Sequence, residues 1–367
     1  MSPSDLKLTN LSPMKYFYYL FLFSGSLLFS CEKDEPFVHE FGTGVYITNE
    51  GFFMQNNGSV SFFRPGDGNL VNNIFEKANS RPAGDIVQSL GIIGDSLAYM
   101  IVNGSSKVEI VRLPDFKAVA DPLEIDYPRY FISVSDVKGY ISSGSMKGNL
   151  IVVDLERHAI IDSIPVGFGP EIMVKKDDMV FVCNSGGFYK DSTISVISVS
   201  TGIVTDTIKT AMCPADMEID AEGYLWVYCR GYVQYDETYT TIISETDAVI
   251  QKIDPLSGTI LWQGKVGKAG DYTTVFPRLS ATADGNDIYY LRPDGAYYLS
   301  SASPKINAGP SIGGNYYGIF IHPADDDIYL FEANLSGNGM MHIFSNNLDK
   351  ISEYMVGIMP NGAVYVP

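Results

Sequence analysis

The chain has 367 residues, a formal net charge of −18 and four histidines, and 46% of its residues are hydrophobic. These side chains suffice for a large core, whereas the excess of acidic residues argues against nucleic acids and anionic polymers as general ligands. Short β-branched and aromatic runs separated by 35 glycines and 19 prolines predict an all-β fold with many turns.

The N-terminal segment predicts export. Residues 1–30 resemble a secretion signal with its start at Met14, where Lys15 precedes an apolar run too short to span a membrane. Leu28-Phe29-Ser30-Cys31 resembles a bacterial lipobox, so Cys31 is the expected lipidation site. A signal cleaved elsewhere, with an incidental cysteine, is the alternative.

The residues after Cys31 predict where the protein is located. Glu32-Lys33-Asp34-Glu35 resembles the Lys-acidic-acidic signal that sends Bacteroidetes lipoproteins to the outer face of the outer membrane. Residues 31–42 are expected to form a lipidated tether, and the lipid is the only expected contact with the membrane. The prediction is therefore an outer-membrane lipoprotein that faces the cell exterior.

A phrase made of a proline, an apolar strand, a turn and a second apolar strand recurs along the rest of the chain, most clearly at 213–229. The prolines that begin it lie at positions 82, 128, 170, 214, 277 and 360, in steps of 46, 42, 44, 63 and 83 residues. The last step spans two copies, because 316–321 repeats the phrase without its proline. A four-stranded propeller blade takes roughly 40–50 residues, so this period predicts a β-propeller.

The first segment is out of phase and predicts how the ring closes. Residues 45–49 are expected to form a second strand, 60–64 a third strand and 70–75 an outer strand. The missing inner strand is expected from 363–366, so that the two chain ends complete one blade and leave no open sheet edge. Residues 43–367 are therefore predicted to form a single propeller domain.

Six further blades follow, which makes a seven-bladed β-propeller of four-stranded blades. The 63-residue step is explained by an insertion at 230–247, expected between the second and third strands of its blade. The further blades are predicted at 81–121, 128–165, 170–210, 214–266, 277–309 and 316–357.

Three cysteines remain in the predicted domain, namely Cys183, Cys213 and Cys229. An odd number in an exported chain leaves at least one thiol unpaired. Cys183 and Cys229 end the second strands of adjacent blades, so a disulfide between them is one reading. Small buried hydrophobic side chains are the favoured interpretation.

Propeller topology places two sets of loops on one face: those that precede the inner strands and those that join second to third strands. Here they are rich in aromatic, amide and charged side chains, which suits an uncharged or zwitterionic ligand. Exposed paired aromatics are the strongest candidates, because they are costly without a partner, whereas many polar residues there could be ordinary turn residues. Glu171, Arg278 and Tyr316 also lie in these loops. The candidate ligand-binding residues are Asn49, Glu50, Phe52, Phe53, Arg81, Asp85, Asn103, Arg129, Tyr130, Asn184, Phe188, Tyr189, Arg230, Tyr232, Arg292, Tyr317 and Asn334.

The sequence carries no motif that identifies a catalytic or metal site. No histidine stands in a nucleophile motif, and no Gly-rich phosphate loop follows a strand and begins a helix. Asp325-Asp326-Asp327 could suggest calcium, but a polar turn is favoured. We therefore expect a protein that is not an enzyme and has no metal or cofactor.

Several phrases carry a family resemblance. The repeat Pro-x-x-hydrophobic, Gly-x-hydrophobic, Val-x-Val-Ile-Asp resembles that of YncE-like propellers. The chain resembles more closely a Bacteroidetes lipoprotein family that includes the BtuG-type cobalamin-binding proteins, in VYITNEGF (45–52), RPAGDIVQS (81–89), YLWVYCRG (224–231) and VGIMPNGA (356–363). This resemblance implies a β-propeller that captures cobalamin or a related corrinoid and passes it to a TonB-dependent outer-membrane transporter.

Two other classes of function stay open at this point. A glycan-binding or scaffold lipoprotein of a nutrient-uptake complex would use the same loops. A propeller lyase or hydrolase would use carboxylates near the central channel, whose separation the sequence does not reveal.

Overall fold

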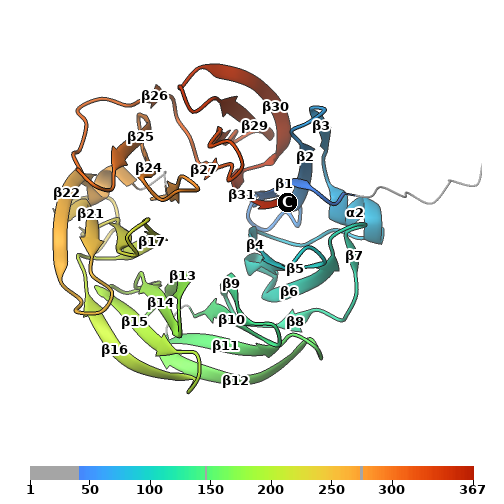
Figure 1. Ribbon diagram of the computed structural model, residues 1–367, viewed down its shortest axis with the longest axis horizontal. Helices are drawn as coiled ribbons and strands as arrows, with labels where there is room; N and C mark the ends of the chain where they lie inside the picture. The colour runs from blue at the N-terminus through green and yellow to red at the C-terminus, as the bar shows by residue number, and fades with distance from the viewer. Residues whose placement is uncertain (1–40, 145–146, 273–275) are drawn as a thin grey trace, which may run out of the picture. The chain divides into compact units, whose positions relative to one another are not determined.

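The repeated phrases form the inner and second strands of a ring of blades (Figure 1). The computed structural model describes residues 41–367 except 145–146 and 273–275. In these residues six blades have four strands and one has five, which confirms the predicted seven-bladed propeller. The predicted signal, the lipidation site Cys31 and all but the last two residues of the tether lie outside the described residues.

Each blade is an antiparallel meander that runs outward from the centre. The inner strands are β31 (Pro360–Val366), β4 (Val87–Ile93), β9 (Pro128–Ser135), β13 (Pro170–Lys176), β17 (Pro214–Ile219), β23 (Leu279–Ala281) and β27 (Gly318–Ile321). The second strands are β1 (Gly44–Asn49), β5 (Leu97–Val102), β10 (Lys138–Ser143), β14 (Met179–Asn184), β18 (Leu225–Cys229), β24 (Asp287–Arg292) and β28 (Ile328–Glu332).

The outer half of each blade is more variable in length. The third strands are β2 (Ser59–Arg64), β6 (Lys107–Arg112), β11 (Gly148–Asp154), β15 (Thr193–Ser198), β21 (Asp247–Ile253), β25 (Gly295–Ser300) and β29 (Asn338–Phe344). The outermost strands are β3 (Asn69–Val71), β7 (Lys117–Ala118) with β8 (Leu123–Glu124), β12 (Ala159–Val166), β16 (Ile203–Lys209), β22 (Ile260–Lys268), β26 (Ile312–Gly313) and β30 (Lys350–Ile358).

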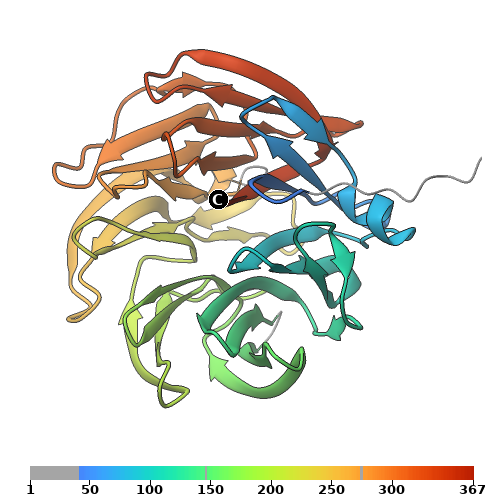
Figure 2. The same cartoon turned by 45° about the vertical axis from the view of Figure 1, so that its right-hand side comes forward.

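The ring closes as predicted, by pairing of the two ends of the domain. β31 is antiparallel to β1, and the register places Val45 opposite Tyr365 and Ile47 opposite Ala363. In Figures 1 and 2 the red C-terminal strand accordingly lies beside the blue N-terminal strands. Proline has no backbone N–H to donate to a neighbouring strand, so it is tolerated at the first residue of a strand but not in its interior.

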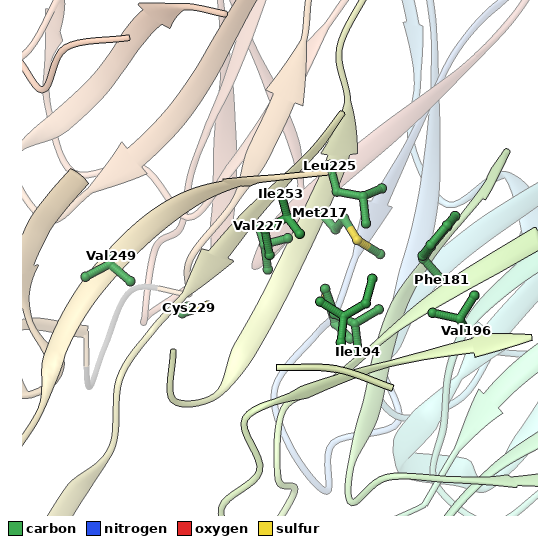
Figure 3. Close-up of a cluster of buried hydrophobic side chains, with 11 residues drawn as sticks. Phe181, Ile194, Val196, Met217, Leu225, Val227, Cys229, Val249 and Ile253 are labelled. Atoms are coloured by element: carbon green, nitrogen blue, oxygen red, sulfur yellow. The ribbon is translucent and has the colours of Figure 1, made fainter. Parts of the chain in front are cut away.

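The core lies between neighbouring blades. Figure 3 shows Phe181 and Ile194 of one blade packed toward Met217, Leu225 and other side chains of the next, all of them buried. Apolar side chains that alternate along these strands fill the space between two sheets. Each blade is therefore stabilised mainly by its neighbours.

The three cysteines of the domain are free and buried. Cys183 and Cys229 both belong to the apolar cluster of Figure 3. Burial raises the pKa of both thiols, that of Cys229 to about 12. They serve as small hydrophobic side chains, as the favoured interpretation had it, and not as a disulfide.

One predicted strand is wrong in its second half. β3 ends at Val71, and the helix α2 (Ile74–Asn79) replaces the rest of the expected strand at 70–75. Asn73 has a left-handed backbone (φ 58°) that turns the chain, and Ile74 and Phe75 are then buried. The Phe75 ring packs edge-on against Phe116 at 6.5 Å, so this apolar residue reaches the core from a helix instead of a strand.

The insertion at 230–247 is a separate hairpin of β19 (Val233–Tyr235) and β20 (Ile242–Glu245), between the second and third strands of its blade as predicted. Two short 3-10 helices, Asn103–Ser105 and Ala269–Tyr272, lie in loops. Among the described residues, no helix is long and apolar enough to cross a membrane.

Candidate functional site

The loops that precede the inner strands and those that join second to third strands meet around one central cavity. Residues from all seven blades line it, and its volume is about 340 Å³. We call this side of the propeller, with loops 50–58, 127–129, 185–192 and 230–246, the cavity face. The lining residues are Glu50, Ile86, Gln88, Arg129, Tyr130, Glu171, Ser185, Gly187, Ala215, Arg230, Phe276, Pro277, Arg278 and Tyr317.

Arg129 ties three neighbouring inner strands together at the wall of the cavity. Its Nε donates to the Glu171 carboxylate at 2.9 Å, and its Nη1 donates to Oε1 of Gln88 at 2.6 Å. Burial lowers the pKa of Arg129, but Glu171, Tyr130 and Glu50 together outweigh this effect and the pKa is raised. The two side chains therefore form an ion pair at the wall of the cavity.

Arg278 and Tyr130 form a bridge across the channel. Nη1 of Arg278, just before β23, donates to the Tyr130 hydroxyl of β9 at 2.8 Å, although the two blades are not neighbours. Gln88, Tyr130 and Arg278 line both the upper cavity and a second cavity of about 230 Å³ deeper in the channel. They therefore form a partition, which is the floor of the upper cavity.

Glu50 is held by two neutral donors. The Tyr317 hydroxyl donates to its Oε2 at 2.8 Å, and Nδ2 of Asn361 donates to its Oε1 at 2.9 Å. Burial and the neighbouring Glu50 raise the pKa of Tyr317, so its proton stays in place for this bond. The carboxylate is fixed in orientation at the side of the cavity.

The deeper cavity contains two acidic side chains of β17. Asp216 accepts the backbone N–H groups of Met217 at 2.8 Å and Leu279 at 3.0 Å. Burial raises its pKa to about 6, against the opposing effect of Arg278. Burial, with the nearby Asp216, raises the pKa of Glu218 to about 8. Both groups therefore titrate near neutral pH.

Exposed aromatic side chains lie in the loops of the cavity face. Phe188 is 72% exposed and Phe53 is 67% exposed. The Phe188 ring meets Tyr127 edge-on at 6.0 Å, and Phe276 meets Tyr317 in the same way at 5.9 Å. The arrangement offers apolar surface around a polar, hydrogen-bonding cavity, which suits an amphipathic ligand.

Residues 43–331 match the family described as "Domain of unknown function (DUF5074)". The chain belongs to the DUF5074 family. No curated protein matches it. The DUF5074 fold is similar to that of a quinoprotein alcohol dehydrogenase-like protein from Bacteroides thetaiotaomicron, with 13% identity, a TM-score of 0.62, and 90% of this chain and 79% of that one covered.

Two further solved structures share the fold of this DUF5074 protein. One is a functionally unknown protein from Desulfotomaculum acetoxidans, with 14% identity, a TM-score of 0.59, and 88% and 98% of the two chains covered. The other is a protein from Lactobacillus plantarum, with 9% identity, a TM-score of 0.61, and 89% and 100% covered. At these identities the likeness shows the fold alone, that of a β-propeller.

Of the candidate ligand-binding residues in this DUF5074 domain, five line the cavity: Glu50, Arg129, Tyr130, Arg230 and Tyr317. Another five lie in loops of the cavity face without lining the cavity itself. Of these, Tyr232 lies under the Lys190 ammonium at 5.2 Å, with Lys190 itself exposed. The five are Phe52, Phe53, Phe188, Tyr189 and Tyr232.

Four polar candidates make hydrogen bonds within the fold. Asn49 donates to Oγ of Ser61 at 3.0 Å, and Asn184 donates to Oγ of Ser195 at 3.0 Å. Asn103 donates to a backbone carbonyl, and Asp85 accepts the backbone N–H of Met54. A ligand would have to compete with these bonds. The four residues are Asn49, Asp85, Asn103 and Asn184.

Three more candidates lie away from the cavity. Arg81 forms a bidentate pair with the buried Glu109 and covers the Phe75 ring. Arg292 packs over Tyr297 at 4.7 Å. Asn334 is exposed and bonds within its own turn. None of these three residues lines the cavity.

Sequence reasoning did not select several cavity residues. Gln88, Asp216 and Glu218 belong to inner strands, where alternate residues face the channel, so their period of two was an available signal. Phe276 and Pro277 line the mouth beside Arg278. Glu171 and Arg278 were assigned to the right loops but not to the ligand site.

In the part of the chain that the structure describes, no group of three or more His, Cys, Asp or Glu side chains is suited to hold a metal ion. The acidic run at 325–327 makes a turn in which Asp325 bonds Nδ1 of His322 at 2.8 Å and accepts the N–H of Asp327.

Proposed function

We propose that this DUF5074 protein is a non-catalytic binding protein that captures cobalamin or a related corrinoid on its cavity face. The observation that carries the proposal is the central cavity, which is lined by guanidinium, carboxylate, amide and phenol groups on a face whose loops also carry exposed aromatics. A corrinoid has apolar ring faces and an amide-bearing edge. Such a ligand needs both kinds of surface.

The size of the cavity constrains how such a ligand would bind. A volume of about 340 Å³ is at the small end of ligand pockets, and a corrinoid is much larger. The macrocycle would therefore lie across the mouth, against Phe188 and its aromatic neighbours. One peripheral group would enter the cavity and bond lining side chains such as Arg230.

Delivery to a TonB-dependent transporter and attachment by a lipid at Cys31 belong to the same proposal. The lipobox-like residues 28–31 and the acidic segment 32–35 support them. Labelling with a radioactive fatty acid should mark the wild-type protein but not a Cys31→Ala variant. Protease treatment of intact cells should remove the protein if it faces outward, and its full resistance would contradict that location.

Calorimetric titration with cyanocobalamin tests ligand capture. We expect the Phe188→Ala, Tyr232→Ala double variant to bind about tenfold more weakly, since loss of aromatic contacts costs about 1–2 kcal/mol. Its Tm should be unchanged, because Phe188 is exposed and Tyr232 is only partly buried. Leu256→Ala, 77% exposed in a turn between third and outer strands, is the control.

Three outcomes of these titrations discriminate among functions. Absence of heat with cyanocobalamin at high micromolar concentration would contradict corrinoid capture. Heat with a neutral oligosaccharide instead would favour the glycan-binding alternative. Equal loss of binding and Tm in the double variant would show that the two aromatic side chains belong to the core.

One observation favours a second candidate, a lyase or hydrolase. Glu218, raised in pKa and without a hydrogen bond among the described residues, has the properties of a general acid. The Arg278–Tyr130 partition separates it from the upper cavity, which disfavours that role. Turnover on a glycan panel that Glu218→Gln abolishes would support it.

A further inference from the structure

We propose that Arg230 and Arg278 form a subsite for one oxyanion group of the ligand, a phosphodiester or a carboxylate. Its link to a corrinoid rests on the proposed function above. The nucleotide loop of cobalamin carries one phosphodiester, which would be the group that enters the cavity. The subsite itself can be tested without any corrinoid.

The first observation concerns the unused donors of Arg278. Its Nη1 donates to the Tyr130 hydroxyl, but its Nε is inaccessible to water and has no acceptor among the described residues. No carboxylate lies within ion-pair distance among the described residues, since Asp216 is directed to two backbone N–H groups. A guanidinium N–H that water cannot reach and that lacks an acceptor is costly unless an acceptor arrives.

Arg230 is the second guanidinium of the cavity, and it makes no side-chain hydrogen bond or ion pair with any described residue. It directly follows β18, and its backbone N–H donates to the Cys213 carbonyl at 3.0 Å. The backbone is therefore fixed while the side chain, which lines the cavity, keeps all of its donors. Guanidinium groups bind carboxylates and phosphates through paired N–H donors.

The other charged groups of the cavity are already satisfied. Arg129 is paired with Glu171, and Glu50 accepts two bonds from Tyr317 and Asn361. Arg230 and Arg278 thus leave an excess of donors in a cavity of a chain whose net charge is −18. The cavity therefore favours a ligand group with acceptor oxygens and one negative charge over a cationic ligand group.

The first arm of the test uses small probes and measures Tm. We expect dimethyl phosphate or acetate at millimolar concentration to raise the Tm of the wild type, while neutral dimethyl sulfone does not. Arg230→Met and Arg278→Lys should lose most of this response. Arg157→Met, in the turn after β11 that joins a third to an outer strand, removes an exposed cation and should respond like the wild type.

The second arm compares cyanocobalamin with dicyanocobinamide, which lacks the phosphodiester. We expect the wild type to prefer cyanocobalamin about tenfold, and Arg230→Met to reduce that preference to near one. The loss of one charge-assisted contact accounts for a change of this size.

The arms separate two kinds of failure. If dimethyl phosphate or acetate binds in an arginine-dependent way but cyanocobalamin does not bind, the subsite stands and the corrinoid proposal fails. A response to acetate alone would identify the group as a carboxylate. If neither probe acts, or if both act equally on wild type and arginine variants, the subsite is overturned. Arg230→Met keeps the test valid should Arg278→Lys fail to fold.

Discussion

Single side chains join the inner strands into one site. Arg129 connects three neighbouring strands, and Arg278 reaches Tyr130 across the channel. Each bond is charge-assisted or buried, so each has a larger effect on stability than a surface ion pair. The cavity is therefore rigid before any ligand arrives, which lowers the entropic cost of binding.

Glu218 predicts a specific pH dependence of stability. Its ordinary pKa of 4.5 is raised by burial to about 8 in the folded protein. The folded state thus holds the proton more tightly than the unfolded state. The contribution of this carboxyl group to the free energy of unfolding is therefore fully present below pH 4.5 and is lost as the pH rises to 8. Relative to Glu218→Gln, the wild type should lose about 2–4 °C in Tm between pH 5 and pH 8.

Thermal unfolding of both proteins across this range checks the prediction. Asp216 is present in both proteins, so the part of its titration that does not depend on Glu218 cancels in the comparison. A Tm difference that is the same at every pH would show that Glu218 is not raised in pKa.

The roles of individual residues were only partly predictable. Exposed aromatics such as Phe188 were identified, because paired aromatic residues between two strands are unusual in a turn. Asn49 and Asn184 were not distinguished from ligand-binding residues, because an amide that bonds its own blade looks the same in sequence as one that faces a ligand. Glu218 was missed, although an acidic residue within an inner strand is a signal of its own.

At the scale of elements, the packing between blades determines stability. Second and third strands present buried apolar residues to the neighbouring sheet, as Leu225 and Ile253 do in the cluster of Figure 3. Outer strands have more exposed positions, for example in β16. The interior strands should therefore tolerate substitution least.

A matched pair of substitutions in one blade tests this gradient. Leu225→Ala removes a fully buried side chain and should lower the free energy of unfolding by about 2–5 kcal/mol. Leu256→Ala makes the same change at an exposed turn and should lower it by less than about 0.5 kcal/mol. Denaturant unfolding of both variants measures the difference. Similar effects at the two sites would contradict the description of the core.

Most strands were predictable because a period of two and turn residues mark them locally. The failure at 70–75 has a physical reason. Asn73 adopts a left-handed backbone and the next two apolar residues are buried on a helix, which the apolar pattern alone did not reveal. The hairpin β19–β20 was predicted as an insertion but not as a sheet. The 63-residue step between two prolines showed where extra residues lie, but it carried no information on their structure.

At the scale of the whole molecule, the two ends of the domain close the ring. β31 contributes the inner strand of the blade whose other strands are β1, β2 and β3. This closure was predictable from the phase of the repeat, because the first segment lacked an inner strand and the last one had an extra. Closure removes the exposed edges that an open ring would present.

Removal of β31 should therefore unfold more than one blade. A variant without residues 360–367 should show no cooperative thermal transition, or a Tm lower by at least about 10 °C. A variant that lacks only Pro367, which is exposed, should match the full chain. Circular dichroism melts compare the two. A normal transition in the truncated protein would mean that β31 does not close the ring.

Hydrogen–deuterium exchange with and without cyanocobalamin tests the central claim, that the cavity face binds ligand, most directly. We predict that saturating ligand slows exchange in 50–58, 127–131, 185–192 and 276–279, and leaves the turns at 155–158 and 254–259 unchanged. Slowed exchange at those turns, or no change in the loops of the cavity face, would contradict it.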